Sequence, residues 1–243
     1  MDALSRRTLL KTMGGFGAAL SLGACAETRP MPVATLPAAP TVAGLSGYDS
    51  QRYALMYGPR PTERFPLPVV DLSKIQPQFL RTNIAYATDK APGTIVIDPA
   101  AHYLYAVEPF GRATRYGVGV GREGFGWSGV ATINSKQEWP DWYPPKEMIE
   151  READLAAKLT TLQSGIGMAS GPTNPLGARA LYLWQNGKDT LFRIHGTSQP
   201  WTIGTSVSSG CIRMISQDVI DLYERTPIGT EVVVLGNAVP LTG

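Results

Sequence analysis

Residues 194–214 read I-H-G-T-S-Q-P-W-T-I-G-T-S-V-S-S-G-C-I-R-M, which places His195 16 positions before Cys211. The stretch holds one of the two histidines and one of the two cysteines of the 243-residue chain. Three small residues, Ser-Ser-Gly at 208–210, stand directly before the cysteine. A thiol with an imidazole in reach can carry out covalent acyl transfer, because the imidazole takes the proton and the thiolate attacks a carbonyl carbon.

The N-terminus carries the pattern of an export signal. Residues 5–11 read S-R-R-T-L-L-K, a twin-arginine signature, and a glycine-rich apolar stretch too short for a membrane span follows. A basic patch before a short core helix is the alternative. Residues 22–25 resemble a lipoprotein processing box, which would leave Cys25 as a lipidated N-terminus. Residues 24–26 also fit a small-residue cleavage site that would remove Cys25, and both interpretations stay open.

The charge of the chain comes mostly from this signal. The 22 basic and 20 acidic residues become 19 of each once residues 1–24 are removed. No basic run with interleaved aromatic residues occurs, so nucleic acid is not an expected partner. No apolar run of about 18 residues follows the signal, so the only expected membrane attachment is a lipid on Cys25. We expect a mature, exported protein in the periplasm or cell envelope whose single thiol is Cys211.

Composition divides the chain into four segments. Residues 1–26 are the export signal, and residues 27–47, rich in Pro, Ala, Thr and Gly, are expected to be a flexible tether. Residues 48–91 carry aromatic residues among many prolines and are expected to form an irregular arm that packs on the main domain. Residues 92–237 are the expected catalytic domain, long enough to build one core.

The main domain has the pattern of short strands. Thr94–Asp98 and Tyr103–Val107 are rich in β-branched and aromatic residues on either side of a turn. Residues 185–188 read Gln-Asn-Gly-Lys, and Asn-Gly is a strong hairpin signal. Lys146–Leu159 has a helical pattern, and Ser216 is expected to cap a second, shorter helix. The one remaining histidine, His102, lies in a turn and is expected at the surface.

Residues 194–214 resemble the signature of the L,D-transpeptidase catalytic domain, the YkuD family, which carries His-Gly, a spacer and then Ser-x-Gly-Cys-x-Arg. The likeness covers roughly residues 92–237. Residues 93–108 resemble the opening hairpin of the family, while Trp-Pro-Asp-Trp at 139–142 and Asn-Pro-Leu-Gly-Ala at 174–178 resemble its proteobacterial ErfK/YbiS-like branch. The residue before the Gly-Cys pair is often His or Arg in the family and is serine here, so no role of that side chain is carried over.

The resemblance implies a mainly β fold, a mixed β-sandwich or barrel-like arrangement with a few short helices. It implies enzymes that act on peptidoglycan stem peptides, at the bond between the third residue and the terminal D-amino acid. An acyl-enzyme forms on cysteine, and an amine then resolves it. The amine belongs to another stem (a 3–3 cross-link), to a free D-amino acid, or to a lysine of an outer-membrane protein. No metal or other cofactor is implied.

Cys211 and His195 are the expected catalytic pair. Cys211 would be the nucleophile, with a small buried hydrophobic residue as the alternative. His195 would be the base that forms the thiolate and then the acid that protonates the leaving group, with a hydrogen-bonded core histidine as the alternative. An imidazole partner is expected to lower the thiol pKa below its usual value of about 8.5. The resemblance suggests that a backbone carbonyl near Gly196 orients the imidazole.

The remaining expectations concern the cysteine loop. The amides of Gly210 and Cys211 are suited to form an oxyanion hole, and a glycine lets the chain approach the substrate closely. Ser208 and Ser209 are expected to support this loop, with Ser208 bonded to its backbone. Arg213 is expected to bind a substrate carboxylate, and a structural ion pair is the equal alternative.

Three other classes of protein were weighed against this interpretation. Papain-like and NlpC-like cysteine peptidases place the cysteine before the histidine, the reverse of the order here. Sortases share the order His, Cys, Arg but need a much longer spacing between the first two. The third is a non-catalytic peptidoglycan-binding anchor, against which the intact pair of His195 and Cys211 speaks. A mass increase by one acyl or one β-lactam adduct would distinguish an enzyme from an anchor.

Overall fold

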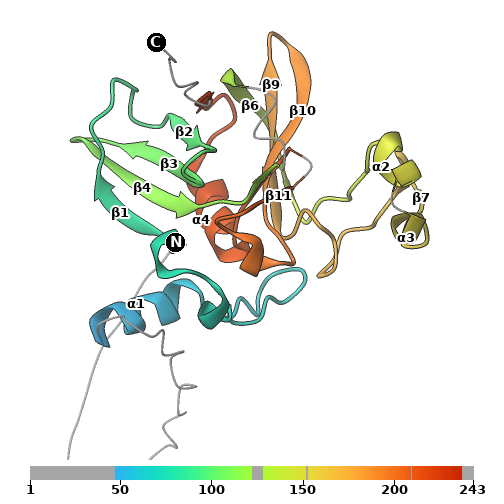
Figure 1. Ribbon diagram of the computed structural model, residues 1–243, viewed down its shortest axis with the longest axis horizontal. Helices are drawn as coiled ribbons and strands as arrows, with labels where there is room; N and C mark the ends of the chain where they lie inside the picture. Colours follow the sequence, from blue (N-terminus) through green and yellow to red (C-terminus); the bar gives the residue numbers. More distant parts are fainter. Residues whose placement is uncertain (1–46, 122–127, 152, 209, 237–243) are drawn as a thin grey trace, which may run out of the picture. The chain divides into compact units, whose positions relative to one another are not determined.

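The computed structural model describes residues 47–121, 128–151, 153–208 and 210–236 (Figure 1). The chain divides after Pro37 into two units, and all of the described residues belong to the second. The export signal with Cys25, most of the expected tether and Ser209 lie outside the described residues. Within the described ranges the helices α1 (Gly47–Met56) and α4 (Ser216–Arg225) have ten residues each, and no helix there is long and apolar enough to span a bilayer.

One mixed sheet of nine strands dominates the described chain, in the order β1-β4-β3-β2-β13-β6-β9-β10-β12. The pairs β13–β2 and β10–β12 are parallel, and the other pairs are antiparallel. The prediction of a mainly β chain with a few short helices is confirmed. The nine strands are β1 (Thr82–Ala85), β2 (Ile95–Asp98), β3 (Tyr103–Glu108), β4 (Arg112–Gly117), β6 (Gly129–Glu138), β9 (Arg179–Gln185), β10 (Lys188–His195), β12 (Ile212–Arg213) and β13 (Glu231–Val234).

Two small ribbons and several short helices complete the fold. The ribbons pair β5 (Val120–Gly121) with β11 (Ser206–Ser208), and β7 (Thr160–Leu162) with β8 (Gly165–Gly167). The other helical elements are α2 (Lys146–Arg151), α3 (Ala153–Ala156), and the 3-10 turns η1 (Leu72–Lys74), η2 (Pro77–Phe79) and η3 (Pro200–Thr202).

Two local predictions need correction. The single helix expected over Lys146–Leu159 is instead two short helices, α2 and α3, and the second ends at Ala156 before the chain enters β7 with its β-branched threonines. Ser216 does not cap α4, since Ile215 is the residue before the helix and makes no side-chain cap. The Ser216 hydroxyl instead donates to the carbonyl oxygen of Thr197 (3.4 Å), two residues after His195.

The apolar side chains of the sheet pack around α4. Val219 and Leu222 of that helix are fully buried in the main core. Figure 1 shows α4 between the β1–β4 strands and the β6–β9–β10 strands, and the core members come from both groups. The sheet therefore folds around this helix. The buried strand residues include Ile95, Ile97, Leu104, Tyr116, Ile133, Leu181, Leu183, Ile194, Ile212 and Val232.

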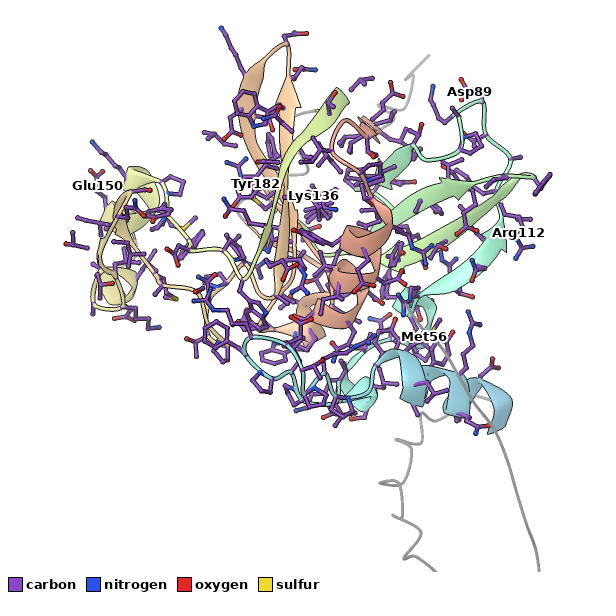
Figure 2. All side chains as sticks on the ribbon, turned by 180° about the vertical axis from the view of Figure 1, so that it is seen from behind. Met56, Asp89, Arg112, Lys136, Glu150 and Tyr182 are labelled. Atoms are coloured by element: carbon purple, nitrogen blue, oxygen red, sulfur yellow. The ribbon has the colours of Figure 1, made fainter. Side chains whose placement is uncertain are left out.

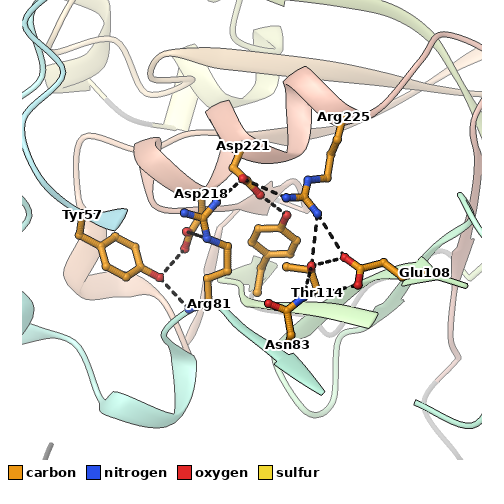
Figure 3. Close-up of polar contacts among 9 residues, drawn as sticks. Tyr57, Arg81, Asn83, Glu108, Thr114, Asp218, Asp221 and Arg225 are labelled. Atoms are coloured by element: carbon orange, nitrogen blue, oxygen red, sulfur yellow. Dashed lines mark hydrogen bonds and ion pairs between the residues drawn. The ribbon is translucent and has the colours of Figure 1, made fainter. Parts of the chain in front are cut away.

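The segment 48–91, called the N-terminal arm below, is anchored to α4 by a buried polar network (Figure 3). The hydroxyl of Tyr57 donates to Asp218 (3.1 Å) and accepts the backbone N–H of Arg81 (2.7 Å). The Arg81 guanidinium forms ion pairs with Asp221 (2.7 Å) and Asp218 (3.5 Å). Burial raises the pKa of Asp218 to about 7, while the charge of Arg81 acts against this. The arm thus holds the helix that begins beside the His195 segment.

The same network reaches the sheet. The Tyr116 hydroxyl of β4 donates to Asp221 (2.5 Å), and Arg225 at the end of α4 pairs with Glu108 of β3 (3.3 Å). Glu108 also accepts the hydroxyl of Thr114 (2.5 Å). Figure 3 shows these residues in one continuous set of contacts between α4 and the strands. Helix, sheet and arm are therefore linked by buried and half-buried hydrogen bonds as well as by apolar packing.

A second contact of the arm reaches β9. The Glu63 carboxylate accepts hydrogen bonds from the two terminal guanidinium nitrogens of Arg179 (2.8 Å each) and from the indole N–H of Trp139 (2.9 Å). Burial acts to raise the pKa of Glu63, but these hydrogen bonds hold it below its ordinary value. Arg179 is the first residue of β9, and its carbonyl oxygen accepts the N–H of Gly196 (3.1 Å). This contact therefore bears on the backbone next to His195.

Candidate active site

The expected catalytic residues lie at two neighbouring parallel strands, with His195 at the end of β10 and Cys211 directly before β12. Ile194 of β10 pairs with Ile212 of β12, and both side chains are fully buried in the core. Because side chains alternate along a strand, His195 lies on the opposite face of the sheet. Arg213 follows Ile212 and is the pairing partner of His195, and Cys211 directly precedes β12. The structure thus places Arg213 beside His195, and Cys211 at the start of the strand that pairs with the His195 strand.

Backbone hydrogen bonds fix the imidazole of His195. Its Nδ1 lies 2.5 Å from the carbonyl oxygen of Gly196, and the side chain is buried, with 4% of its surface exposed. A carbonyl oxygen can only accept, so Nδ1 carries the proton and Nε2 is the nitrogen with the free electron pair. The His195 carbonyl accepts the N–H of Met214 (2.8 Å), which ties β10 to the chain after β12.

The protonation state of His195 suits a base. Burial lowers the pKa of the imidazole to about 4, and the positive charges of Arg213 and Arg193 act in the same direction. Backbone hydrogen bonds with Gly196 and Pro175 act against the shift. At neutral pH the ring is therefore uncharged and able to accept a proton through Nε2.

The Asn-Pro-Leu-Gly-Ala segment packs directly on the histidine. The Asn174 side chain donates to the carbonyl oxygens of Pro140 (3.2 Å) and Met168 (3.1 Å), and its own oxygen accepts the N–H of Leu176 (2.9 Å). These bonds hold the segment against Gly196. A Cβ on Gly196 would lie 3.1 Å from Ala178 N and 3.2 Å from Ser216 Oγ, so this position has room only for glycine without displacement of neighbours.

Cys211 is half-buried against β10. Its thiol donates to the carbonyl oxygen of Leu191, with Sγ 3.8 Å from that oxygen. Burial raises the pKa of the thiol, and a backbone hydrogen bond from Arg193 with the charges of Arg193 and Arg213 offsets this only in part. The expectation of a thiol pKa below the ordinary value is therefore wrong for the resting structure. Solvent exclusion outweighs the positive charges around the sulfur.

Gly210 has a conformation that favours glycine. Its φ is +124°, and a Cβ there would lie 2.9 Å from Cε1 of the Phe192 ring. The chain therefore enters Cys211 through a position where both the backbone angle and the contact exclude a side chain. Ser208 is the last residue of β11, the strand that leads to this loop, and Ser209 lies outside the described residues.

Two further residues on the same face were not predicted. The guanidinium of Arg193 lies 4.5 Å from the ring centroid of Tyr182, its partner on β9. Figure 2 shows Tyr182 pointing away from α4, whereas Lys136 of the neighbouring strand points toward it. The sequence already indicated the face on which Arg193 lies, since it directly precedes the buried Ile194 and neighbouring side chains of a strand point to opposite faces.

The backbone of Arg213 has a structural role as well. Its N–H and carbonyl pair with Gly119 (2.8 and 2.9 Å), next to β5. The Arg213 side chain is half-buried, and its charge acts on both His195 and Cys211 as described above. His102 lies in a turn as predicted and is half-buried, and its Nε2 lies 3.0 Å from the Ser206 hydroxyl of β11. The turn therefore contacts the strand that leads into the cysteine loop.

The chain is similar in sequence to proteins of a known family. Residues 92–234 match the family described as YkuD: L,D-transpeptidase catalytic domain. A protein of Escherichia coli K12 named "Probable L,D-transpeptidase ErfK/SrfK" is 31% identical over 153 residues, which are 61% of this chain and 46% of that protein. "Probable L,D-transpeptidase YbiS" of the same strain is 32% identical over 129 residues, 51% of this chain and 38% of that one. The chain thus spans less than half the length of these relatives.

The chain is also similar to proteins of solved structure. One from Brucella melitensis, named as a probable carnitine operon oxidoreductase, is 52% identical and covers 68% of this chain and 99% of that chain, with a TM-score of 0.45. An L,D-transpeptidase from Mycobacterium smegmatis is 18% identical and covers 60% of this chain and 59% of that chain, with a TM-score of 0.42. Among the described residues no group of three or more His, Cys, Asp or Glu is placed to hold a metal ion.

Proposed function

The chain belongs to the YkuD family of L,D-transpeptidase catalytic domains, and we propose that it acts as a peptidoglycan L,D-transpeptidase. The observation that supports the proposal is that β10, which ends at His195, pairs in parallel with β12, which begins directly after Cys211, while the imidazole is oriented through Gly196. A cysteine acyltransferase needs a base near the thiol with one nitrogen unprotonated, and the neutral imidazole of His195 fits that requirement.

In the proposed first step, Nε2 of His195 takes the proton of the Cys211 thiol. The sulfur attacks the carbonyl carbon of the third residue of a tetrapeptide stem, and the C–N bond to the terminal D-amino acid breaks. The imidazolium returns the proton to the leaving amine, so a free D-amino acid departs and a thioester remains on Cys211. The neutral resting state of His195 supports its role as the proton acceptor.

The second step reverses the first with a new amine. The neutral imidazole takes a proton from the incoming amine as its nitrogen attacks the thioester, and the thiol is regenerated with a new amide bond. A side-chain amine of another stem would give a 3–3 cross-link. A free D-amino acid would give exchange, and a lysine of an outer-membrane protein would give covalent attachment of that protein to the cell wall.

Charge that develops on the carbonyl oxygen needs hydrogen-bond donors. We propose the backbone amides of Gly210 and Cys211 for this role, because Gly210 has a positive φ directly before the nucleophile and a glycine lets a substrate carbonyl approach the backbone closely. The positive charges of Arg193 and Arg213 lie near both members of the pair and suit a substrate rich in carboxylates. Ser208 and Ser209 belong to the loop that carries these amides.

We further propose export of this protein to the cell envelope by the twin-arginine route. The basis is the pattern of residues 5–26 together with a substrate that exists only outside the cytoplasm. Lipidation of Cys25 and its removal by cleavage remain the two alternatives for the mature N-terminus.

Incubation of the full chain with a defined disaccharide-tetrapeptide tests the proposed activity. Mass spectrometry is expected to find loss of the terminal D-amino acid, with formation of a 3–3 linked dimer or of an exchanged stem when a second D-amino acid is supplied. The Cys211→Ala variant serves as the control and is expected to leave the stem intact. Binding of the stem without conversion by the wild-type chain would overturn the proposal in favour of the peptidoglycan-binding anchor.

A further inference from the structure

Strand β10 carries a bulge beside the nucleophile. Asp189 pairs with Trp184 of β9, and Arg193 pairs with Tyr182. Three residues of β10, at positions 190–192, therefore stand opposite the single residue Leu183. This is a larger irregularity than the usual one-residue bulge, and such features re-aim backbone groups near functional sites.

Asp189 holds the bulge in shape. One carboxylate oxygen accepts the N–H of Leu191 (2.9 Å) and a guanidinium nitrogen of Arg193 (2.7 Å), and the other oxygen accepts the second guanidinium nitrogen (2.7 Å). The Thr190 hydroxyl donates to Leu183 O (2.6 Å) and accepts the N–H of Phe192 (3.2 Å). The side chains of Asp189 and Thr190 thus fix the backbone N–H groups of Leu191 and Phe192 within the bulge.

Leu191 is the strained residue at the centre of the bulge. Its φ is +63° although it is neither glycine nor asparagine, and 73% of its side chain is exposed. A bulky residue in this region is unusual and is retained only where neighbouring contacts impose it. The Leu191 side chain faces solvent, so its packing does not stabilise the positive φ. The contacts of the Leu191 backbone groups therefore account for this conformation.

Two residues of the bulge and the residue that follows it meet the cysteine loop. The Leu191 carbonyl accepts the Cys211 thiol, with 3.8 Å between oxygen and sulfur. The Phe192 ring lies against Gly210, at the place where a Cβ would come within 2.9 Å of it. The backbone of Arg193 forms a hydrogen bond with the sulfur that favours the thiolate. The bulge thus offers an acceptor to the thiol and a donor to the thiolate, side by side.

We propose that the β10 bulge is the cradle that orients the Cys211 sulfur, and that Asp189 is the positioning residue that keeps this cradle in shape. The Leu191 carbonyl holds the S–H of the resting thiol, and the Arg193 N–H receives the sulfur once His195 has taken the proton. The inference rests on the proposed function for its meaning in catalysis. Its geometric part concerns thiol reactivity alone and can be tested without any peptidoglycan substrate.

The alternative is that Asp189 and Arg193 form an ion pair that only stabilises the hairpin. Such a pair would affect the unfolding temperature, and its loss would change the titration of Cys211 only through the negative charge of Asp189, which raises the thiol pKa. The cradle predicts a further change that comes from the position of the Leu191 carbonyl. Loss of Asp189 removes a negative charge that raises the thiol pKa, and it releases the carbonyl that holds the S–H, so the thiol should ionise at lower pH.

The test measures the rate of alkylation of Cys211 by iodoacetamide against pH in the full chain, resolved by peptide mass spectrometry so that Cys25 does not contribute. In Asp189→Ala the midpoint is expected to fall by about half a pH unit or more. Asp189→Asn keeps an oxygen for the Leu191 N–H but loses the charge, so a smaller shift in the same direction is expected. Leu191→Gly tolerates the positive φ and keeps the carbonyl, so its profile is expected to match wild type.

Asp71 provides the matched control. Its carboxylate also accepts a backbone N–H two residues ahead (3.2 Å, from Ser73) and pairs with a nearby cation (3.3 Å, Lys74), but it caps η1 in the arm. Asp71→Ala is expected to leave the alkylation midpoint unchanged. Because both variants lose the charge, equal midpoints in Asp189→Ala and Asp189→Asn would overturn the cradle. Failure of stem turnover in the wild type, with the Asp189 shift present, would reject the proposed function and leave the cradle standing.

Discussion

The Nδ1 nitrogen of His195 lies 2.5 Å from the carbonyl oxygen of Gly196, the next residue in the chain. No carboxylate is needed for this orientation, because the carbonyl itself fixes the tautomer and the ring plane. Gly196 is held in turn by Arg179, whose carbonyl accepts its N–H (3.1 Å). The glycine after the histidine therefore serves two purposes, close packing against Ala178 and presentation of a carbonyl to the imidazole.

The first prediction concerns pH. The imidazole pKa of about 4 lies below the ordinary value, so the base form should persist from neutral pH down to about pH 5. The acid limb of kcat/KM for stem cleavage, which reports the free enzyme, is therefore expected near pH 4 to 5. His195→Ala is expected to lower kcat by about 10²- to 10⁴-fold at neutral pH. His102→Gln, at the other histidine, should keep the acid limb at the same pH. An acid limb near 6.5 in the wild type would contradict the buried, neutral imidazole.

The second prediction concerns Gly210. Alanine there would adopt φ +124° and place its Cβ 2.9 Å from the Phe192 ring, so the loop before Cys211 should shift. Gly210→Ala is expected to lose most turnover and about 1–3 kcal/mol of unfolding free energy. Gly165→Ala is the matched control, because Gly165 has φ +129° and nothing within 4 Å of the added Cβ. It should lose similar stability and retain turnover. Equal turnover in the two variants would argue against a precise position for the loop.

The third prediction concerns the N-terminal arm. Tyr57→Phe removes the donor to Asp218 and the acceptor for the Arg81 N–H, two buried groups. A cost of about 1–3 kcal/mol in unfolding free energy is expected, because a buried group without a partner loses its hydration. Tyr86→Phe keeps the stacked ring on Tyr105 and should change stability by less than about 0.5 kcal/mol. Denaturant unfolding of both variants measures the difference. Equal midpoints would show that the arm contributes little to the fold.

The fourth prediction concerns inhibition. A carbapenem-type β-lactam should acylate Cys211, because its strained amide opens on attack by sulfur without loss of a leaving group. Intact-protein mass spectrometry is expected to find one adduct per chain, dependent on His195 and unaffected by Cys25→Ser. A chelator should not change the rate, since two histidines far apart in sequence and one cysteine make a poor zinc site. A chelator-sensitive reaction would point to a metal enzyme.

Local sequence signals were sufficient for part of the fold. The Asn-Gly pair predicted a hairpin, and β9 ends at Gln185 while β10 begins at Lys188. The first strands were predicted from their β-branched residues, and Ile95–Asp98 and Tyr103–Glu108 confirm them. Ser216 failed as a helix cap because a tertiary partner, the Thr197 carbonyl, took its hydroxyl. Propensity at a helix end was outweighed by a contact between residues far apart in the chain.

The candidate site could be predicted only as a set of residues. The spacing of His195 and Cys211 does not reveal that their strands pair in parallel, since β12 has two residues and no recognisable strand pattern. The bulge at Leu191 was not predictable, because its positive φ arises from contacts with Asp189 and the cysteine loop. The raised thiol pKa also depends on burial in the folded chain, which the sequence around the cysteine does not report.

The central claim is that Cys211 forms a thioester with a tetrapeptide stem after proton transfer to His195. Rapid acid quenching of the full chain with the stem, followed by intact-protein and peptide mass spectrometry, tests this most directly. The account predicts one adduct with the mass of the stem less its terminal D-amino acid, located on Cys211, strongly slowed in His195→Ala and absent in Cys211→Ala. An adduct that persists in Cys211→Ala, or stem turnover at the wild-type rate in Cys211→Ser, would contradict it.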